Sequence, residues 1–492
     1  MGARISGTGT GAAMGEDLSR LDVATLRRYF ADRSVSPVDH VRAVLERLDE
    51  CEPWLSSFIT IDRDNAVAAA REAERRITEL GTAAFRDAPL LGMAVSVKDL
   101  IPTKGLRTTR GSAKFADWVP DYDPPVVQRL RRAGAVLLGK TNTSESGWSG
   151  STCNRLVPPT RNPWNRALGA GGSSGGAAAS VAMGIGVAGV GTDGAGSVRI
   201  PAAFCGVVGF KPSFGRIPYV PTSPENLSHI GTLTRTVDDA AAVFDVLAGP
   251  DARDPYSLPR NPADAVQGLA ERSGSQRLRV GWVLSFGSPA TDPEIARLAR
   301  DAVDSLAAAG HVVEPVEVPF EDPYPSLEVI LATAEAAAHD GDDEAIDPGL
   351  LEVIELGRTI SGTELAGAVR CRAQLADSLR ELMCRYDVLA TATVPIGPFP
   401  AGLAQPESPI PKGRLPWLSW TPATYPFNLS GYPAISVPAG FNVAGLPVGL
   451  QLSGGWREDL TVLRAAKAVQ DLRPWQASYD ALLSGGETGD PS

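Results

Sequence analysis

Histidine and cysteine are scarce in this chain of 492 residues, and their placement excludes the usual metal sites. The four histidines, His40, His229, His311 and His339, are scattered, and none lies four residues from another or within a cysteine cluster. The five cysteines are odd in number, widely spaced and lack a C-x-x-C pair, which predicts free thiols. We therefore expect no protein metal site.

Basic charge and long apolar runs are also lacking. The formal net charge is −11, so the chain has no basic surface suited to nucleic-acid backbones or anionic lipid. The most apolar window, residues 177–190, contains a serine and three glycines and is shorter than the roughly 18 to 20 residues of a membrane span. Residues 1–16 lack the apolar region of a secretory signal. We expect a cytoplasmic protein with a small-molecule substrate and no nucleic-acid or membrane partner.

The hydrophobic pattern predicts an α/β protein. Two or three helices, with apolar residues at helical spacing, come first, and Ser36 followed by Pro37 is a typical helix start. Short apolar runs at 91–97 and 136–139 then predict strands on either side of a helix at 126–133. Strands that alternate with helices indicate a largely parallel sheet.

The rest of the chain changes in composition several times. Residues 169–215 are rich in Gly, Ala and Ser but too apolar for a linker, so we expect packed backbone there. Residues 249–389 predict helices over one end of the sheet, with one β-like run at 278–283. A proline-rich loop at 395–417 precedes two strands, 433–438 and 447–452, joined by a turn, and a last helix at 458–472.

Two glycine-rich stretches match common motifs in letters only. Residues 171–176 (GGSSGG) lead into a helix, where N–H groups suit an anion or an oxyanion, although a tight turn explains the glycines equally. The same stretch fits the G-x-S-x-G elbow of an α/β-hydrolase, but residues 161–165 before it are not expected to form a strand. Residues 184–189 fit G-x-G-x-x-G but follow a helix and enter a strand, which is the reverse of a dinucleotide site.

Ser197 is the better candidate nucleophile. The three residues before it, Gly-Ala-Gly, supply small side chains and free N–H groups where an oxyanion can develop. No histidine has a comparable glycine-framed setting, so lysine remains as the base. Lys98 follows the apolar run 95–97, and burial there favours its neutral amine.

These residues resemble the amidase signature family. The similarity runs through 171–176, 191–193 and 196–212, and extends to 97–99, 139–142 and 428–436. It covers most of residues 20–475 and is weakest between 250 and 420. It implies one large α/β/α domain around a mixed, mostly parallel sheet over residues 17–480, with core motifs at 90–215 and 425–475 and a variable region at 250–425. Flexible tails are expected at 1–16 and 481–492.

The resemblance also implies a mechanism. The family's Ser-Ser-Lys triad falls on Lys98, Ser173 and Ser197, with a cis peptide bond before Ser173. Ser197 attacks the carbonyl, Ser173 relays the proton to neutral Lys98, and water later hydrolyses the acyl-enzyme. No metal or cofactor takes part. The oxyanion hole is implied for the backbone N–H groups of four consecutive residues, Gly194, Ala195, Gly196 and Ser197.

This chain departs from the family within that loop. The family usually has Gly where Ala195 stands and a larger residue where Gly194 stands. One methyl group is tolerated if Ala195 has a negative φ, and the family's cyclic amide dimer hydrolases have a similar Ala-Gly-Ser. Asp193 and Arg199 are expected to form a structural charge pair, and Lys211 is expected to be structural.

The substrate is less constrained than the reaction. By position, Gly147 and Trp148 are expected beside the acyl pocket, with Trp417 and Trp420 at the end of the proline-rich loop forming another wall. We expect an aryl amide, anilide, linear oligoamide or carbamate (urethane). Homodimers are common in the family.

Three alternatives remain open. The glutaminase subunit of a tRNA-dependent amidotransferase has an acidic residue just upstream of the Asn428 motif, and residues 421–424 supply none. A Ser-His-Asp α/β-hydrolase esterase that uses Ser173 would depend on a histidine. An inert binding scaffold would not need Lys98, Ser173 and Ser197 together.

Overall fold

The N-terminal helices begin at the caps that the sequence provides. In the computed structural model, α1 (Val23–Asp32) starts after Asp22, whose side chain accepts the N–H of Thr25. Helix α2 (Pro37–Leu55) starts after Ser36, whose hydroxyl accepts the N–H of Asp39 at 3.1 Å. Helix α3 (Arg63–Leu80) and the short α4 (Ala84–Asp87) follow strand β1 (Phe58–Ile61), which was not predicted, and precede the first predicted strand. The two or three helices expected at this end of the chain are therefore present.

The structure describes residues 16–260, 264–272, 277–287, 290–339, 345–407 and 413–484. Of the predicted tails, residues 1–15 and 485–492 lie outside these ranges, whereas residues 481–484 belong to helix α16 (Gln476–Ser484). The predicted domain boundaries therefore stay predictions.

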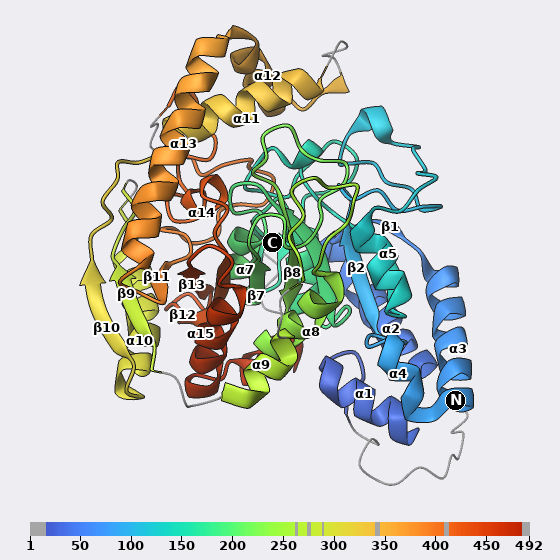
Figure 1. Ribbon diagram of the computed structural model, residues 1–492. Helices are drawn as coiled ribbons and strands as arrows, with labels where there is room; N and C mark the ends of the chain where they lie inside the picture. Colours follow the sequence, from blue (N-terminus) through green and yellow to red (C-terminus); the bar gives the residue numbers. More distant parts are fainter. Residues whose placement is uncertain are drawn as a thin grey trace.

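A central sheet of eleven strands organises the described chain (Figure 1). The strands, in sheet order, are β1 (Phe58–Ile61), β3 (Val136–Thr141), β2 (Ala94–Lys98), β6 (Ala188–Asp193), β8 (His229–Thr234), β7 (Val208–Lys211), β12 (Ala434–Phe441), β13 (Pro447–Gly454), β11 (Val388–Ala392), β9 (Arg279–Val283) and β10 (Val312–Val316). The site-bearing strands β2 and β6 are neighbours in the N-terminal half of the sheet.

The sheet is mixed, as predicted, but parallel pairs are not in the majority. Strand β2 runs parallel to β3 and β6, and β9 runs parallel to β10 and β11. Every other neighbouring pair is antiparallel. The expectation of a mostly parallel sheet was wrong because β8, β7, β12 and β13, which are neighbours in the middle of the sheet, all pair antiparallel. Strands β12 and β13 form the predicted hairpin.

Helices cover both faces of the sheet. On one face α5 (Pro125–Arg132), α8 (Val237–Leu247), α9 (Ala265–Arg272), α10 (Pro293–Ala308) and α15 (Asp459–Leu472) form a chain of contacts. Figure 1 shows α8, α9 and α15 in front of the strands. On the other face α6 (Gly175–Ala182) and α7 (Arg199–Cys205) contact each other and the strands beneath them. The predicted α/β/α layering is confirmed.

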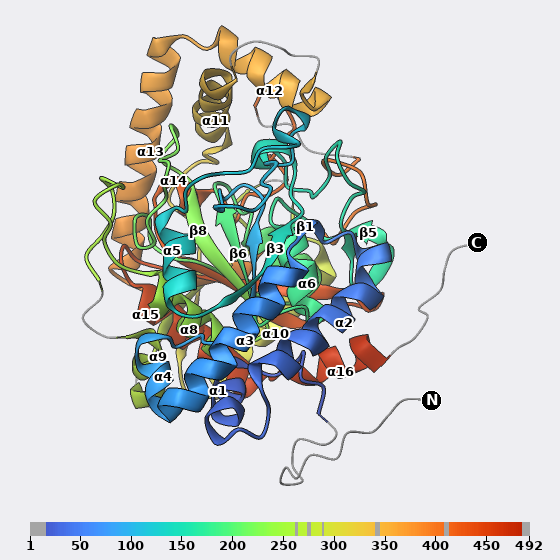
Figure 2. The same ribbon diagram turned by 90° about the vertical axis from the view of Figure 1, so that its right-hand side faces the viewer.

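The segment between residues 249 and 389 contributes more to the sheet than expected. One β-like run was predicted, and β9 fulfils it, but β10 and β11 join it at the sheet's C-terminal edge. Strand β10 (VVEPV) is at most half-buried and contains a proline and a glutamate, so it lacks an apolar run. The helices α11 (Tyr324–Ala338), α12 (Pro348–Thr359) and α13 (Gly362–Met383) pack together beyond one end of the strands (Figures 1 and 2).

A small hairpin corrects the prediction for residues 161–165. Strand β4 (Arg161–Asn162) pairs antiparallel with β5 (Asn165–Gly169), because the Asn162 side chain accepts the N–H of Trp164 and closes the turn. The hairpin is a separate two-stranded sheet and not a strand of the central sheet. The strand that directly precedes residues 171–176, β5, is therefore not a strand of the central sheet, which a nucleophile elbow requires.

Short elements complete the described chain. Two are helices, α14 (Pro426–Leu429) and α16 (Gln476–Ser484), and three are single 3₁₀ turns at 81–83, 113–115 and 145–147. Within the described ranges, no helix has the length and apolar character needed to cross a membrane.

Candidate active site

The three predicted catalytic residues lie at one end of the sheet. Lys98 is the last residue of β2, and Ser197 lies between β6 and α7. Because β2 and β6 are parallel neighbours, their carboxyl ends meet at the same edge. Ser173 lies just before α6, its peptide bond with Gly172 is cis, and the N–H of Ser174 donates to the carbonyl of Ser197 at 3.1 Å. The two serine segments are thereby held together.

Lys98 contacts Ser173 directly. The Lys98 Nζ–Ser173 Oγ distance is 2.7 Å, and both side chains are buried. The Lys98 amine also donates to Thr192 Oγ1 at 2.9 Å and, more weakly, to the Thr192 carbonyl at 3.5 Å. A neutral amine has two N–H groups and one lone pair, so Thr192 can take the N–H groups while the lone pair faces the Ser173 hydroxyl.

Burial makes a neutral Lys98 attainable near neutral pH. Desolvation lowers the pKa of Lys98 from 10.5 to about 7, and the negative charge of Asp193 opposes this shift only in part. The amine can therefore accept a proton at physiological pH. Such a perturbed group at the edge of a cavity is typical of a general base.

A buried ion pair holds the loop that contains Ser197. Arg199 donates from Nε to Asp193 Oδ2 and from Nη2 to Oδ1, both at 3.0 Å, and neither side chain is exposed. Burial alone would raise the pKa of Asp193, but the Arg199 guanidinium holds it well below its usual range. The predicted structural pairing is confirmed.

The same pair connects the loop to the C-terminal part of the chain. Arg199 donates to Gln451 Oε1 and to the carbonyl of Thr424, both at 2.9 Å, and to Asn428 Oδ1 at 2.6 Å. Asn428 in turn donates to the carbonyl and the carboxylate of Asp193. The geometry of the Ser197 loop thus depends on residues more than two hundred positions later.

One of the four predicted oxyanion donors is already engaged. The N–H of Gly196 donates to Asp193 Oδ1 at 2.7 Å, because the carboxylate turns back under the loop. In the described part of the chain, no acceptor takes the N–H of Gly194, Ala195 or Ser197. The prediction is therefore corrected for Gly196, while the other three donors stay candidates.

The small residues of this loop meet specific packing constraints. Gly196 has a φ of +127°, and a Cβ there would lie 2.5 Å from Thr424 Oγ1, so a side chain is excluded. Ala195 does not have a positive φ, which meets the condition for its extra methyl group. The Ala195 carbonyl accepts the Thr424 hydroxyl at 2.7 Å.

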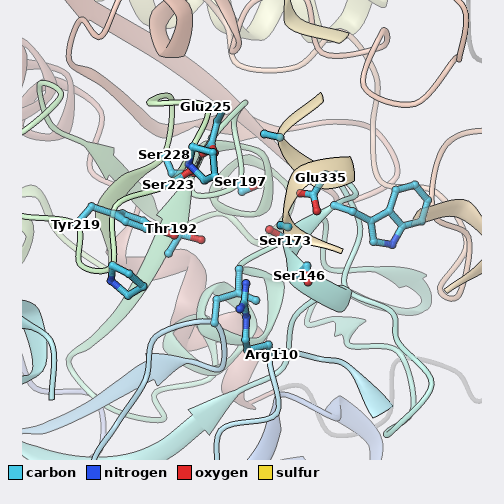
Figure 3. A pocket seen from close by; sticks show the side chains of 18 of the residues that line it. Arg110, Ser146, Ser173, Thr192, Ser197, Tyr219, Ser223, Glu225, Ser228 and Glu335 are labelled. Carbon is cyan, nitrogen blue, oxygen red and sulfur yellow. Dashed lines mark hydrogen bonds between the residues drawn. The ribbon is translucent and has the colours of Figure 1, made fainter. Parts of the chain in front are cut away.

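A cavity of about 330 Å³ opens above the serines. It is lined by Ser173 and Ser197 (Figure 3). Gly147 and Trp148 also line it, as predicted for the acyl pocket. Gly147 lies close to Ser173, since a Cβ on it would be 3.3 Å from the Ser173 hydroxyl. Trp148 is buried and its carbonyl accepts the indole N–H of Trp417, which also lines the cavity.

Trp420 does not belong to this wall. Its ring packs with Phe204 and Phe399 in a separate apolar cluster behind α7. The expectation that both tryptophans line the pocket was wrong for Trp420, because the short turns at 417–421 point the two rings in different directions.

The sequence did not reveal the charged residues of the cavity. Arg110, from the loop after β2, and Glu335, from α11, both line it, and Figure 3 shows them on different sides of the serines. Thr192 was noted only as part of a motif, although it is a direct partner of Lys98. Arg110 and Glu335 carry no local sequence signal, because their positions depend on long-range packing.

The histidines and Lys211 have other partners. His40 is buried, with Nδ1 2.9 Å from the Leu18 carbonyl, and His229 lies between Lys211 and the Leu227 carbonyl. Lys211 donates to the Tyr432 carbonyl at 2.6 Å, as expected of a structural lysine. His339 alone of the four lines the cavity, where its Nδ1 lies near the Glu335 backbone.

The chain matches the family model described as Amidase over residues 39–463. A curated relative, the acylamidase of Rhodococcus erythropolis, is 36% identical over 472 residues, covering 94% of this chain and 97% of the relative. A glutamyl-tRNA(Gln) amidotransferase subunit from Roseiflexus sp. (strain RS-1) is 35% identical over 497 residues, covering 94% of this chain and 99% of the relative.

Solved structures show the same fold over nearly the whole chain. A bacterial aryl acylamidase of the amidase signature family aligns with a TM-score of 0.87 and 29% identity, covering 96% of this chain and all of that one. A 6-aminohexanoate cyclic dimer hydrolase bound to its substrate aligns with a TM-score of 0.85 and 29% identity, covering 95% and 100%.

Proposed function

The chain belongs to the amidase signature family and is a hydrolase of amide C–N bonds, and we propose that it acts through an acyl-enzyme on Ser197. The observation that carries the proposal is the 2.7 Å contact between Lys98 Nζ and Ser173 Oγ, beside a cavity that Ser197 also lines. The reaction needs a base that is neutral near pH 7, and Lys98 meets that need.

Hydrolysis proceeds in two stages, acylation of Ser197 and then deacylation by water. The Ser197 oxygen forms a bond to the carbonyl carbon while its proton passes to Ser173, whose own proton passes to Lys98 Nζ. The C–N bond then breaks, and the same relay in reverse returns the proton to the leaving amine. Water then enters the vacated place and bonds to the acyl carbon while one of its protons passes through Ser173 to Lys98. The bond between the acyl carbon and the Ser197 oxygen breaks, the relay returns the proton to that oxygen, and the acid leaves.

Negative charge on the carbonyl oxygen is stabilised during both stages. The candidate donors are the N–H groups of Gly194, Ala195 and Ser197, because none of them has an acceptor within the described chain. The Asp193 carboxylate accepts the N–H groups of Gly196 and Val198, and these two hydrogen bonds hold the loop so that the three candidate donors stay in position. Its role is to position the loop and not to contact substrate.

The cavity favours a small amide with an aromatic or extended apolar part. Trp148 and Trp417 supply apolar wall, and the volume suits a molecule of modest size. An aryl amide, anilide, linear oligoamide or carbamate fits this description. The names of the acylamidase relative and of the two structural neighbours agree with an amide substrate.

A glutaminase component of an amidotransferase is the second candidate, because several relatives are named as glutamyl-tRNA(Gln) amidotransferase subunits. Against it, residues 421–424 supply no carboxylate, and Thr424 and Thr421 use their hydroxyls on the carbonyls of Ala195 and Leu418. A stand-alone amidase is therefore preferred. A homodimer and a cytoplasmic location stay predictions, which sedimentation and cell fractionation would test.

The deciding experiment combines a substrate panel with active-site labelling. Purified protein is assayed on 4-nitroanilides, primary amides, aryl carbamates and L-glutamine, and is then treated with a fluorophosphonate and digested for peptide mapping. We expect turnover of at least one amide and a label on Ser197. A label on Ser173 alone would contradict the proposed nucleophile, and exclusive turnover of L-glutamine would favour the glutaminase.

A further inference from the structure

Arg110 is a cation of the cavity whose guanidinium has no hydrogen-bond or ion-pair partner among the described residues. Its side chain lines the cavity together with Ser146 and Thr192 (Figure 3). Its Nε is buried and has no hydrogen-bond partner, and no carboxylate of the described residues lies within 4.0 Å of the guanidinium. Arg110 itself is half-buried, but a buried N–H donor such as its Nε is costly to leave without an acceptor.

The fold holds this arginine in place by its backbone. The N–H of Arg110 donates to the Asp99 carbonyl at 3.2 Å, and its carbonyl accepts the N–H of Ser146 at 2.9 Å. Arg110 and Ser146 have φ values of +57° and +51°, which non-glycine residues seldom adopt. The Phe115 ring lies 5.6 Å from the guanidinium carbon and supports it from the side. The side chain is thus fixed beside the catalytic serines.

The acidic residues of the cavity do not neutralise Arg110 by contact. Burial, reinforced by the charge of Glu225 and opposed in part by the charge of Arg110, raises the pKa of Glu335 to about 8, so Glu335 is largely uncharged at pH 7. Glu225 accepts the hydroxyl of Ser228 at 2.6 Å on the loop that carries Tyr219. Because Glu335 is largely uncharged, it repels an anionic ligand at Arg110 only weakly.

We propose that Arg110 binds a carboxylate of the substrate, so that this amidase is specific for amides that carry a carboxylate group. The inference rests on the proposed function, because it takes the cavity above Ser197 as the substrate site. A guanidinium presents parallel N–H groups whose spacing matches the two oxygens of a carboxylate. The residue acts on binding and orientation and takes no part in proton transfer.

Two pairs of isosteric substrates test the proposal on either side of the scissile bond. The first pair is the mono-4-nitroanilide of succinic acid and the 4-nitroanilide of 4-methylpentanoic acid. The second pair is 4-acetamidobenzoate and 4-isopropylacetanilide. For each pair, kcat/KM is measured for the wild type, Arg110→Gln, Arg110→Lys and Lys114→Gln, where Lys114 is an exposed cation of the same loop.

The readout is the ratio of kcat/KM for the charged member to that for the neutral member. In at least one pair we expect the wild-type ratio to exceed one, and Arg110→Gln to lower it about 10- to 100-fold. Arg110→Lys should keep part of the preference, because it retains the charge but not the paired N–H groups, and Lys114→Gln should keep all of it.

Two outcomes would overturn the proposal: a wild-type ratio below one in both pairs, or an equal ratio in the wild type and Arg110→Gln. The first outcome is measured on the wild type alone, so it can overturn the proposal even if the Arg110 variants do not fold. Failure of the proposed function has a different signature, in which the wild type hydrolyses neither member of either pair.

Discussion

The catalytic centre and the opposite wall of the cavity satisfy their polar groups in different ways. In the centre, Lys98, Asp193 and Arg199 each hydrogen bond to partners within the protein, and Asp193 and Arg199 are fully buried. In the wall, the Arg110 guanidinium has no hydrogen-bond or ion-pair partner within the described chain, and Glu335, 3.5 Å from His339 Nδ1, keeps 21% of its side chain exposed.

This difference separates the reaction from its specificity. A group whose partners are all internal keeps its position whether or not substrate is present, which suits a proton relay that every substrate uses. A polar group without an internal partner is satisfied only by a ligand, so it distinguishes one ligand from another. The centre therefore defines amide hydrolysis, and the wall defines which amide.

Ser197→Ala should have the largest effect on activity. A small effect would contradict the distinction between a centre that carries out hydrolysis and a wall that selects the substrate. We expect kcat/KM to fall roughly 10³- to 10⁶-fold, because the acyl-enzyme can no longer form. Ser180→Ala, in helix α6 with its hydroxyl on the Ala177 carbonyl, is the matched control and should stay close to wild type. Retained activity in the Ser197 variant would remove this serine from the mechanism.

Lys98→Ala comes next and is best measured as a pH profile. Protonated Lys98 cannot accept a proton, so wild-type kcat/KM should rise with pH through about 7 and level off above it. The variant should lose about 10²- to 10⁴-fold in kcat together with this rising limb.

Lys140 provides the control for that profile. It is equally buried and its pKa is also lowered by burial to about 7, but it donates to Thr103 and the Ile101 carbonyl. Lys140→Met should lower the thermal stability and leave the rising limb in place. Loss of the limb in the Lys140 variant instead would mean that the profile does not report on Lys98.

Asp193→Asn tests, through protein stability, whether the buried charges of the catalytic centre depend on their partners within the protein. It leaves Arg199 buried beside a neutral amide, and we expect the free energy of unfolding to fall by about 3 to 5 kcal/mol. Urea denaturation measures this change. The control is Asp301→Asn, which breaks the exposed pair with Arg297 and should cost at most about 1 kcal/mol. Similar losses in both variants would contradict the structural role of Asp193.

Trp148→Ala tests the wall with a smaller effect. Loss of the aromatic surface should lower kcat/KM for aryl-acyl substrates relative to acetyl substrates by about 2- to 10-fold. Trp456, whose side chain is exposed and lies away from the cavity, provides the control substitution to alanine. An unchanged ratio in the Trp148 variant would show that the ring supports the wall without contacting the acyl group.

His339→Asn should have the smallest effect. His339 lines the cavity but takes no part in the proton relay through Ser173 and Lys98, so we expect kcat/KM to change by about twofold at most. A loss of a hundredfold or more would revive the histidine-dependent esterase.

The sequence predicts the centre better than the wall for a physical reason. Lys98, Ser173 and Ser197 stand in stretches whose glycines and apolar runs are local signals, and the fold class follows from the alternation of strands and helices. The engagement of Gly196 by Asp193 could not be predicted, because it depends on how one carboxylate turns beneath its own loop.

Contacts between residues far apart in the sequence also could not be predicted. The majority of antiparallel pairs follows from the order of strands in the sheet, which no local pattern contains. Arg110 and Glu335 are 87 and 138 residues away from Ser197 along the chain, and only the packing of α11 over the sheet end brings them to one cavity. Trp417 and Trp420, three residues apart, were separated by the same kind of packing.

The link between the Ser197 loop and Thr424, Asn428 and Gln451 has a consequence for synthesis of the enzyme. The ribosome makes Ser197 more than two hundred residues before Thr424, Asn428 and Gln451, which set its loop. We expect the nascent protein to stay inactive until residue 451 has been made and has folded. A chain that is terminated before that residue should therefore hydrolyse no amide.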